Sequence, residues 1–255
     1  LINPQHQVTI AVVGKYIDLQ DAYKSIYESL TIAGAAHNAE VTIVRIDSES
    51  IEEGDASAII GEVDGILIPG GFGDRGIEGK ILAAQYARST GIPFLGICLG
   101  MQVATVEFAR NVCDLEGAHT TECNKDTPHP VISLQEEQKG IKDMGATMRL
   151  GSCDSIVHPG TLAANLYGGE QTIKERHRHR YEFNPAYLEK LTEAGLIISS
   201  VSAAEGLVEI IELADHPFYI GAQFHPEFQS KPNRPHPLFS GFVKASLKST
   251  AAGSA

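Results

Sequence analysis

IPFLGICLGMQVATVEFAR, residues 92–110, joins a buried-strand pattern to a helical pattern with almost no chain between them. Cys98 lies at the junction, bracketed by Gly96 and Gly100. Glycines at these two positions let the backbones on either side of a sharp turn approach closely, because they carry no Cβ. The stretch therefore predicts an α/β fold in which Cys98 projects from a tight strand-to-helix corner.

Apolar runs on both sides of this corner extend the α/β prediction. Strand patterns and helical patterns alternate through the first half of the chain, at 8–14, 21–38 with Asp21 as N-cap, 41–47, 65–71 and 80–90. Continuous apolar strands are typical of a parallel sheet covered by helices. The later runs at 196–224 form a meander-like series. We expect one open, mostly parallel sheet with helices on both faces and an antiparallel extension.

The bulk composition is that of a globular chain with an acidic balance. Of the 255 residues, 43% are hydrophobic and 20% are charged, and the formal net charge is −12. This charge repels a phosphate backbone, so nucleic acid is not an expected partner. Because no apolar run reaches the roughly 18 residues that span a bilayer and no signal-peptide pattern is present, no membrane association is expected either.

The four cysteines are scattered, and none forms a CxxC pair. This usage is typical of a reducing compartment and predicts a cytoplasmic location. It also gives no support to a zinc site, so no metal is expected. Outside the glycine-bracketed corner, the cysteines are interpreted as structural, namely Cys113, Cys123 and Cys153.

Two nucleotide-binding patterns are only superficially present. GFGDRG at 71–76 fits the dinucleotide fingerprint, but no Asp or Glu lies between Glu78 and Glu107 to bind a ribose. GIEGKI at 76–81 lacks both the first glycine and the hydroxyl residue of a P-loop. A third pattern is the pair of His177 and His179, which lie two residues apart and share a face if they belong to a strand. The neighbouring arginines would repel a cation, so a structural or anion-binding role is favoured over a metal site.

A cysteine nucleophile needs a base, and the base needs an orienting group. At the N-terminus of a helix, unpaired N–H groups and the helix dipole favour the thiolate of Cys98. Among the ten histidines, His225 follows a strongly apolar strand and has Glu227 two residues later. Residues two apart in an extended segment point the same way, so this carboxylate can orient the imidazole.

An oxyanion formed on a substrate carbonyl also needs N–H donors. PGGFG at 69–73 follows another strand at the same end of the sheet, and Leu99 directly follows the corner cysteine. Backbone N–H groups free of side chains can reach a substrate oxygen there. This role explains the glycine-rich loop better than a dinucleotide does.

PGGFG (69–73), GICLGMQ (96–102) and FHPEF (224–228), in this order and spacing, resemble class I glutamine amidotransferases with a Cys-His-Glu triad. The similarity is closer still to the glutaminase domains of the CTP synthase family. It extends from about residue 8 to 247 through further stretches at 13–25, 69–80, 147–151, 175–184 and 234–242.

The resemblance implies a flavodoxin-like core and hydrolysis of L-glutamine through a glutamyl thioester on Cys98, with His225 as proton carrier and Glu227 as its orienter. Gly71 and Leu99 match oxyanion-hole positions. The positions that match glutamine-binding residues of the family are Gly71, Leu99, Gln102, Glu122 and Arg180. A zwitterionic substrate independently needs a carboxylate for its ammonium, and Glu122 can supply it.

The resemblance further implies a partner domain. In the family, an N-terminal synthetase domain uses the ammonia to aminate UTP with ATP and Mg, GTP activates the enzyme, and the enzyme is a homotetramer. No cofactor is expected in this domain. The chain then resembles a C-terminal half in which 1–7 is a linker remnant, 8–248 the glutaminase domain and 249–255 a flexible tail.

Arg75 and Glu78, in a charged segment beside the expected glutamine site, are hypothesised to couple the GTP signal; a solvated loop explains them equally well. The stretch 123–143 matches the family poorly and is expected to be a mobile loop. Ala146 replaces the glycine usual before TMRLG.

Two alternatives stay open at this stage. One is another cysteine hydrolase, a γ-glutamyl hydrolase or a DJ-1-like protein, which has a similar corner but gives no reason for RHRHRYE or DRGIEGK. The other is a catalytically silent regulatory module with the same fold. An intact Cys98, His225 and Glu227 is unexpected in such a module.

Overall fold

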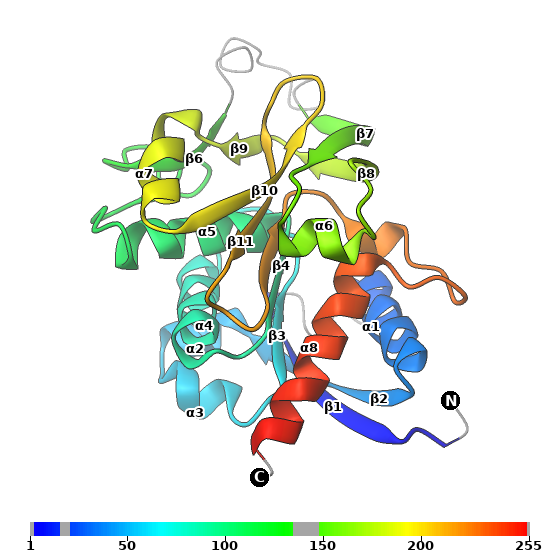
Figure 1. Ribbon diagram of the computed structural model, residues 1–255. Helices are drawn as coiled ribbons and strands as arrows, with labels where there is room; N and C mark the ends of the chain where they lie inside the picture. Colours follow the sequence, from blue (N-terminus) through cyan, green and yellow to red (C-terminus); the bar gives the residue numbers. More distant parts are fainter. Residues whose placement is uncertain (1–2, 16–20, 135–147, 254–255) are drawn as a thin grey trace.

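The computed structural model describes residues 3–15, 21–134 and 148–253 (Figure 1). Its centre is a nine-stranded sheet with the order β2-β1-β3-β4-β12-β11-β10-β7-β8. From β2 to β12 neighbouring strands are parallel, and from β12 to β8 they are antiparallel. The expected parallel core with an antiparallel extension is therefore confirmed, and the order of the parallel half is that of a flavodoxin-like sheet.

The strands of the parallel half are mostly apolar and buried, except for the edge strand β2, most of whose residues are exposed or half-buried. Their bounds are β1 His6–Gly14, β2 Ala39–Asp47, β3 Gly65–Ile68, β4 Phe94–Ile97 and β12 Tyr219–Ala222. The antiparallel half comprises β11 Val208–Leu213, β10 Leu196–Ser202, β7 Arg149–Val157 and β8 Thr172–His179. The sequence pattern places β12 in the meander, and the structure shows that this strand joins the two halves.

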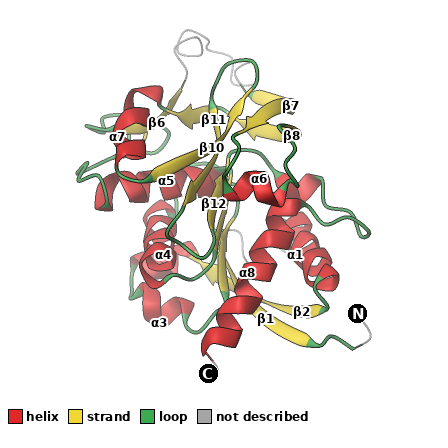
Figure 2. Cartoon of the chain, viewed as in Figure 1, coloured by secondary structure: helices red, strands yellow, loops and turns green. Residues whose placement is uncertain are grey.

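Helices cover both faces of the sheet, as Figure 2 shows. On one face, α2, α3, α4, α5 and α7 pack into one apolar core, and on the other α1, α6 and α8 pack into a second. The bounds are α1 Lys24–Ala36, α2 Ser48–Glu52, α3 Ala56–Ile60, α4 Ile77–Thr90, α5 Leu99–Asn111, α6 Leu162–Leu166, α7 Leu188–Glu193 and α8 Pro237–Gly253. Burial of strands from both sides explains their continuous apolar runs.

A second, three-stranded sheet was not expected from the sequence. It consists of β5 His119–Thr120, β6 Pro130–Leu134 and β9 Tyr181–Phe183, in that order. Its central strand lies in the stretch 123–143 that was predicted to be a mobile loop; the last part of that stretch, 135–143, lies outside the described residues, as does Ala146. The pairing of β6 with β9 involves residues far apart in the chain, which sequence patterns do not reveal.

The predicted element boundaries shift at three places. Asp21 is not the N-cap of α1, because that helix begins at Lys24 after Tyr23, which makes no side-chain cap. β1 begins at His6, inside the predicted linker 1–7. Helix α8 continues through Gly253, beyond the predicted domain end at 248.

The glycines of the corner are required by close backbone contacts. A Cβ added to Gly96 would lie 2.6 Å from the carbonyl carbon of Gly100, and one added to Gly100 would lie 2.1 Å from the carbonyl oxygen of Ile68. Real Cβ atoms do not approach backbone so closely. The corner therefore packs α5 directly against the ends of β3 and β4.

We predict that Gly100→Ala destabilises the chain by at least about 2 kcal/mol, because the added methyl overpacks a backbone contact. This loss is expected although alanine favours a helix by about 1 kcal/mol over glycine. Gly206→Ala is the control: its Cβ meets nothing within 4 Å, but its φ of +70° is strained for alanine. Urea unfolding measures both. If Gly100→Ala lost no more unfolding free energy than Gly206→Ala, the steric account of the corner would be contradicted.

Candidate active site

Cys98 occupies the corner in a strained conformation. Its φ is +53° and its ψ −102°, and it is the N-cap of α5. Its own N–H donates to the Ala222 carbonyl of β12 at 2.7 Å. A positive φ in a residue other than glycine is costly and persists only where the surroundings impose it. The side chain is thereby held at the carboxyl ends of the parallel strands, where sheets of this kind bind ligands.

His225 and Glu227 approach Cys98 from the end of β12. The chain leaves the strand at Ala222 and enters a 3₁₀ turn at Pro226–Phe228. Nδ1 of His225 lies 2.7 Å from Oε1 of Glu227, and the backbone N–H of His225 donates to the Arg176 carbonyl of β8. The predicted imidazole–carboxylate pair is thus formed, and Nδ1 carries the proton that it donates to Glu227.

The surroundings of His225 favour its charged form. Burial by itself lowers the pKa of the imidazole, whereas the interactions with Cys98 and Glu227 raise it. Their sum raises the pKa of His225 to about 10.

Gly70 lies beside the side chains of both Cys98 and His225. A Cβ at this position would lie 2.9 Å from Cε1 of His225 and 3.4 Å from Cβ of Cys98. A side chain larger than hydrogen would push the imidazole away from the sulfur. The sequence motifs point to Gly71 as an oxyanion donor and give no sign of this steric role of its neighbour.

A pocket of about 310 Å³ opens on one side of Cys98. Four of the five predicted glutamine-binding residues line it together with Cys98, namely Gly71, Gln102, Glu122 and Arg180. The fifth, Leu99, is buried; as the first residue of α5 it contributes a backbone N–H of the helix terminus rather than its side chain. The pocket has the size of a small-molecule site. Its other lining residues, which the sequence motifs did not identify as pocket residues, are Phe72, Met148, His179 and Tyr181.

The two ionic side chains of this pocket have opposite charges. Oε1 of Glu122 accepts from the backbone N–H of Gly73 at 2.8 Å, so this carboxylate also fixes the glycine-rich loop. Arg180 comes from the turn between β8 and β9. A carboxylate and a guanidinium on one pocket complement the ammonium and carboxylate of a free amino acid.

A second pocket of about 320 Å³ lies against the same cysteine. It shares Gly71, Phe72 and Cys98 with the first pocket, but His225 and Glu227 line only this one. Cys98 therefore lines both pockets. The first contains the charges that complement an amino acid, and the second contains His225.

Arg75 and Glu78 are both engaged in ion pairs. Arg75 contacts Glu49 at 3.2 Å and donates to the Lys15 carbonyl, while Lys15 donates to the Phe72 carbonyl of the glycine-rich loop. The Arg75 side chain thus reaches the loop beside the pocket through one intermediate residue.

Glu78 accepts two hydrogen bonds from Arg110 and lies 3.3 Å from His119. The hydrogen bond with His119 and the charge of Arg110 lower the pKa of Glu78 to about 2 despite partial burial. These contacts give Glu78 a structural role between α4 and α5, whatever else it does.

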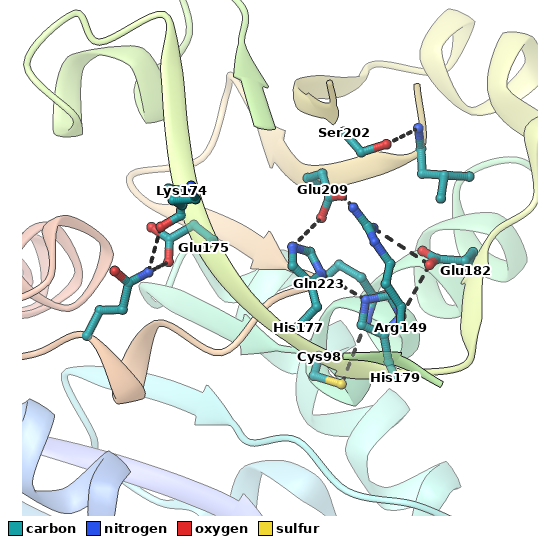
Figure 3. A network of polar contacts seen from close by, with 12 residues as sticks. Cys98, Arg149, Lys174, Glu175, His177, His179, Glu182, Ser202, Glu209 and Gln223 are labelled. Carbon is teal, nitrogen blue, oxygen red and sulfur yellow. Dashed lines mark hydrogen bonds and ion pairs between the residues drawn. The ribbon is translucent and has the colours of Figure 1, made fainter. Parts of the chain in front are cut away.

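His177 and His179 belong to a buried polar cluster behind the first pocket (Figure 3). Along β8 buried and exposed residues alternate, so both histidines face inward while Arg176 and Arg178 face outward. The nearby cation is instead Arg149 of β7. Burial and this charge lower the pKa of His177 to about 2 and of His179 to about 3. Neutral, buried histidines fit the structural role better than the anion-binding role; the sequence left both open.

The cluster contains two carboxylates for the one guanidinium. Arg149 lies 2.6 Å from Glu209 and 3.7 Å from Glu182. Burial raises the pKa of Glu209 to about 7 and raises that of Glu182 well above its usual range, although Arg149 opposes both shifts. Burial therefore favours the protonated form of both carboxylates, against the charge of Arg149.

Within the described ranges there is no group of three or more metal-ligating side chains that could hold a metal ion. In the same residues, no helix has both the length and the hydropathy needed to cross a bilayer.

The family model for glutamine amidotransferase class-I matches residues 18–245. The chain therefore belongs to the class I glutamine amidotransferase family. A glutamine amidotransferase from Methylobacillus flagellatus shares the fold at 12% identity, with a TM-score of 0.58 over 94% of this chain.

Within that family, the similarity is to the glutaminase domains of CTP synthases. The chain is 57% identical to CTP synthase of Moorella thermoacetica over 99% of its length and 55% identical to that of a Synechococcus strain over 98%. It spans about half of these relatives, 47% and 46%. The Trypanosoma brucei CTPS glutaminase domain with bound acivicin has a TM-score of 0.88 at 40% identity, with 94% of both chains covered.

The raised pKa of His225 has a measurable consequence. His225 stabilises the folded chain fully below its ordinary pKa of 6.5, and this stabilisation is lost as the pH rises towards 10. We predict that Glu227→Gln lowers the titration midpoint of His225 by roughly 1–3 pH units, because an opposite charge at hydrogen-bond distance is removed. Imidazole NMR titration measures the midpoint directly.

Glu189→Gln, on the exposed face of α7, is the control and leaves the His225 midpoint unchanged. A midpoint near 6.5 in the unmodified chain, or the same midpoint in the Glu227→Gln variant, would contradict the ion pair.

Proposed function

We propose that this chain hydrolyses L-glutamine to glutamate and ammonia, with Cys98 as nucleophile, His225 as proton carrier and Glu227 as its orienter. The observation that carries the proposal is the position of Cys98, between an imidazole–carboxylate pair and a pocket that contains Glu122 and Arg180. Family membership supports the reaction class, and the geometry supports the individual roles.

In the first half of the reaction the Cys98 thiolate attacks the side-chain amide carbon of glutamine. The N–H groups of Gly71 and Leu99 stabilise the oxyanion. The protonated Nε2 of His225 gives its proton to the departing nitrogen, so ammonia leaves and a glutamyl thioester remains.

In the second half, neutral His225 removes a proton from water, which attacks the thioester carbonyl. The carbon–sulfur bond then breaks, which releases glutamate and regenerates the thiolate beside the imidazolium. Because His225 lines only the second pocket, ammonia leaves and water enters on that side of the sulfur.

Substrate binding uses the charges of the first pocket. Glu122 takes the ammonium of glutamine and Arg180 takes its carboxylate, while Gln102 lines the same pocket. Discrimination against glutamate follows from the side-chain end of the site, where a second negative charge would face the Cys98 thiolate.

The remainder of the proposal concerns the longer protein. We propose that the ammonia is passed to an N-terminal synthetase domain that aminates UTP with ATP and Mg, that GTP activates the enzyme, and that it assembles as a homotetramer in the cytoplasm. The length of the CTP synthase relatives supports a partner domain. This domain then needs no cofactor of its own.

Arg75 and Glu78 are proposed to transmit the GTP signal; the link from Arg75 through Lys15 to the glycine-rich loop supports this role for Arg75.

Labelling with an electrophilic glutamine analogue such as acivicin tests the glutaminase assignment. We predict one adduct per chain, located on Cys98 by peptide mapping, prevented by L-glutamine and not by L-glutamate. The analogue is expected to avoid Cys123 and Cys113, because burial raises the pKa of Cys123 to about 12 and also raises that of Cys113. Both therefore remain unreactive thiols at neutral pH.

Cys98→Ser is the control and forms no adduct. Labelling of another cysteine, or labelling of Cys98 that glutamine does not prevent, would contradict the assignment.

A further inference from the structure

Gln223 is a buried amide in contact with the sulfur of Cys98. It directly follows β12 and is fully buried. Its Nε2 lies 3.7 Å from Sγ of Cys98, within hydrogen-bond range for a sulfur acceptor (Figure 3). None of the sequence motifs assigns a role to this residue.

The hydrogen-bond pattern fixes which end of the Gln223 amide faces the sulfur. Nε2 of Gln102 donates to the carbonyl oxygen of Tyr181 at 3.1 Å and to Oε1 of Gln223 at 3.2 Å. A backbone carbonyl can only accept, so the NH₂ group of Gln102 must point towards Tyr181. Its second hydrogen then requires an oxygen on Gln223, which leaves the NH₂ group of Gln223 towards Cys98.

Both ends of this relay are anchored in the sheets. The Tyr181 carbonyl also lies 3.2 Å from Nδ1 of His179, which is part of the buried cluster on β8. The backbone N–H of Gln223 donates to the Glu209 carbonyl of β11 at 2.8 Å. The relay Tyr181–Gln102–Gln223 therefore ends at the nucleophile with little freedom to rotate.

We propose that Gln223 stabilises the Cys98 thiolate by donating an N–H to its sulfur, and that Gln102 is a positioning residue that acts through Gln223. This inference rests on the proposed role of Cys98 as nucleophile. Hydrogen bonds to an ionised acceptor are about twice as strong as those between neutral groups, so the donor favours the thiolate over the thiol. This hydrogen bond assists both halves of the reaction. The thiolate is the attacking group when the thioester forms and the leaving group when the thioester breaks.

Gln223 differs from His225 in one respect that matters for the cycle. His225 gives up its proton to ammonia and is then neutral, so its charge no longer stabilises the sulfur. The amide of Gln223 keeps its N–H throughout the reaction. It thus supplies a constant donor to the sulfur when the thioester breaks and the thiolate re-forms.

The test is the pH dependence of Cys98 alkylation by iodoacetamide, which reports the thiolate and needs no glutamine. Gln223→Met has a similar length but no donor. We expect the midpoint of its pH–rate profile to rise by about one unit, so that the rate on the acid side of the midpoint falls up to about tenfold. Gln229→Met is the matched control, because Gln229 bonds Glu175 and does not contact Cys98; its profile stays that of the unmodified chain.

Gln102→Met provides a second variant, in which Gln223 keeps its place in the core but loses its orienting partner. The expected change has the same direction and is smaller. In the double variant Gln102→Met/Gln223→Met, the alkylation rate equals that of Gln223→Met alone, because Gln102 acts only through Gln223. Additive losses would overturn the positioning role of Gln102.

The two proposals fail in different ways. If Cys98 of the unmodified chain reacts no faster than the other cysteines, the nucleophile assignment fails, and this inference fails with it. If it reacts selectively and both Gln223→Met and Gln102→Met keep the same pH–rate profile, the donor role of Gln223 alone is overturned.

Discussion

The contact between Gly100 and the Ile68 carbonyl is the constraint on which the site depends. It places the first turn of α5 directly against the end of β3, at a distance that no side chain permits. Cys98 must then turn with a positive φ, which aims its side chain out of the sheet edge. The strain at the nucleophile is therefore imposed by packing two residues away.

The pairing of β12 with β4 brings the second half of the site to this corner. Ala222 stands opposite Ile97, and the N–H of Cys98 continues the ladder to the Ala222 carbonyl. Gln223 and His225, which follow β12 in the chain, consequently both reach the sulfur. One parallel strand pair thus aligns a nucleophile with a proton carrier that lies far from it in sequence.

The local features of the site follow from short stretches and could be predicted. The glycine bracket around Cys98 and the two-residue spacing of His225 and Glu227 each reflect a geometric rule that operates within a few residues. Gln223, Gly70 and the Arg149 cluster could not be predicted in this way, because their roles arise from contacts between distant segments. Asp21 illustrates the opposite error: a good N-cap residue lies near a helix that begins elsewhere.

The most direct test of the account is to catch the covalent intermediate. The chain is mixed with L-glutamine, quenched in acid after milliseconds to seconds, and analysed by intact mass and peptide mapping. A transient glutamyl thioester on Cys98 is predicted in the unmodified chain, and it should be absent from Cys98→Ser. Glutamate release without any acylated Cys98 at any time, or acylation of a different residue, would contradict the central claim that this corner cysteine is the nucleophile.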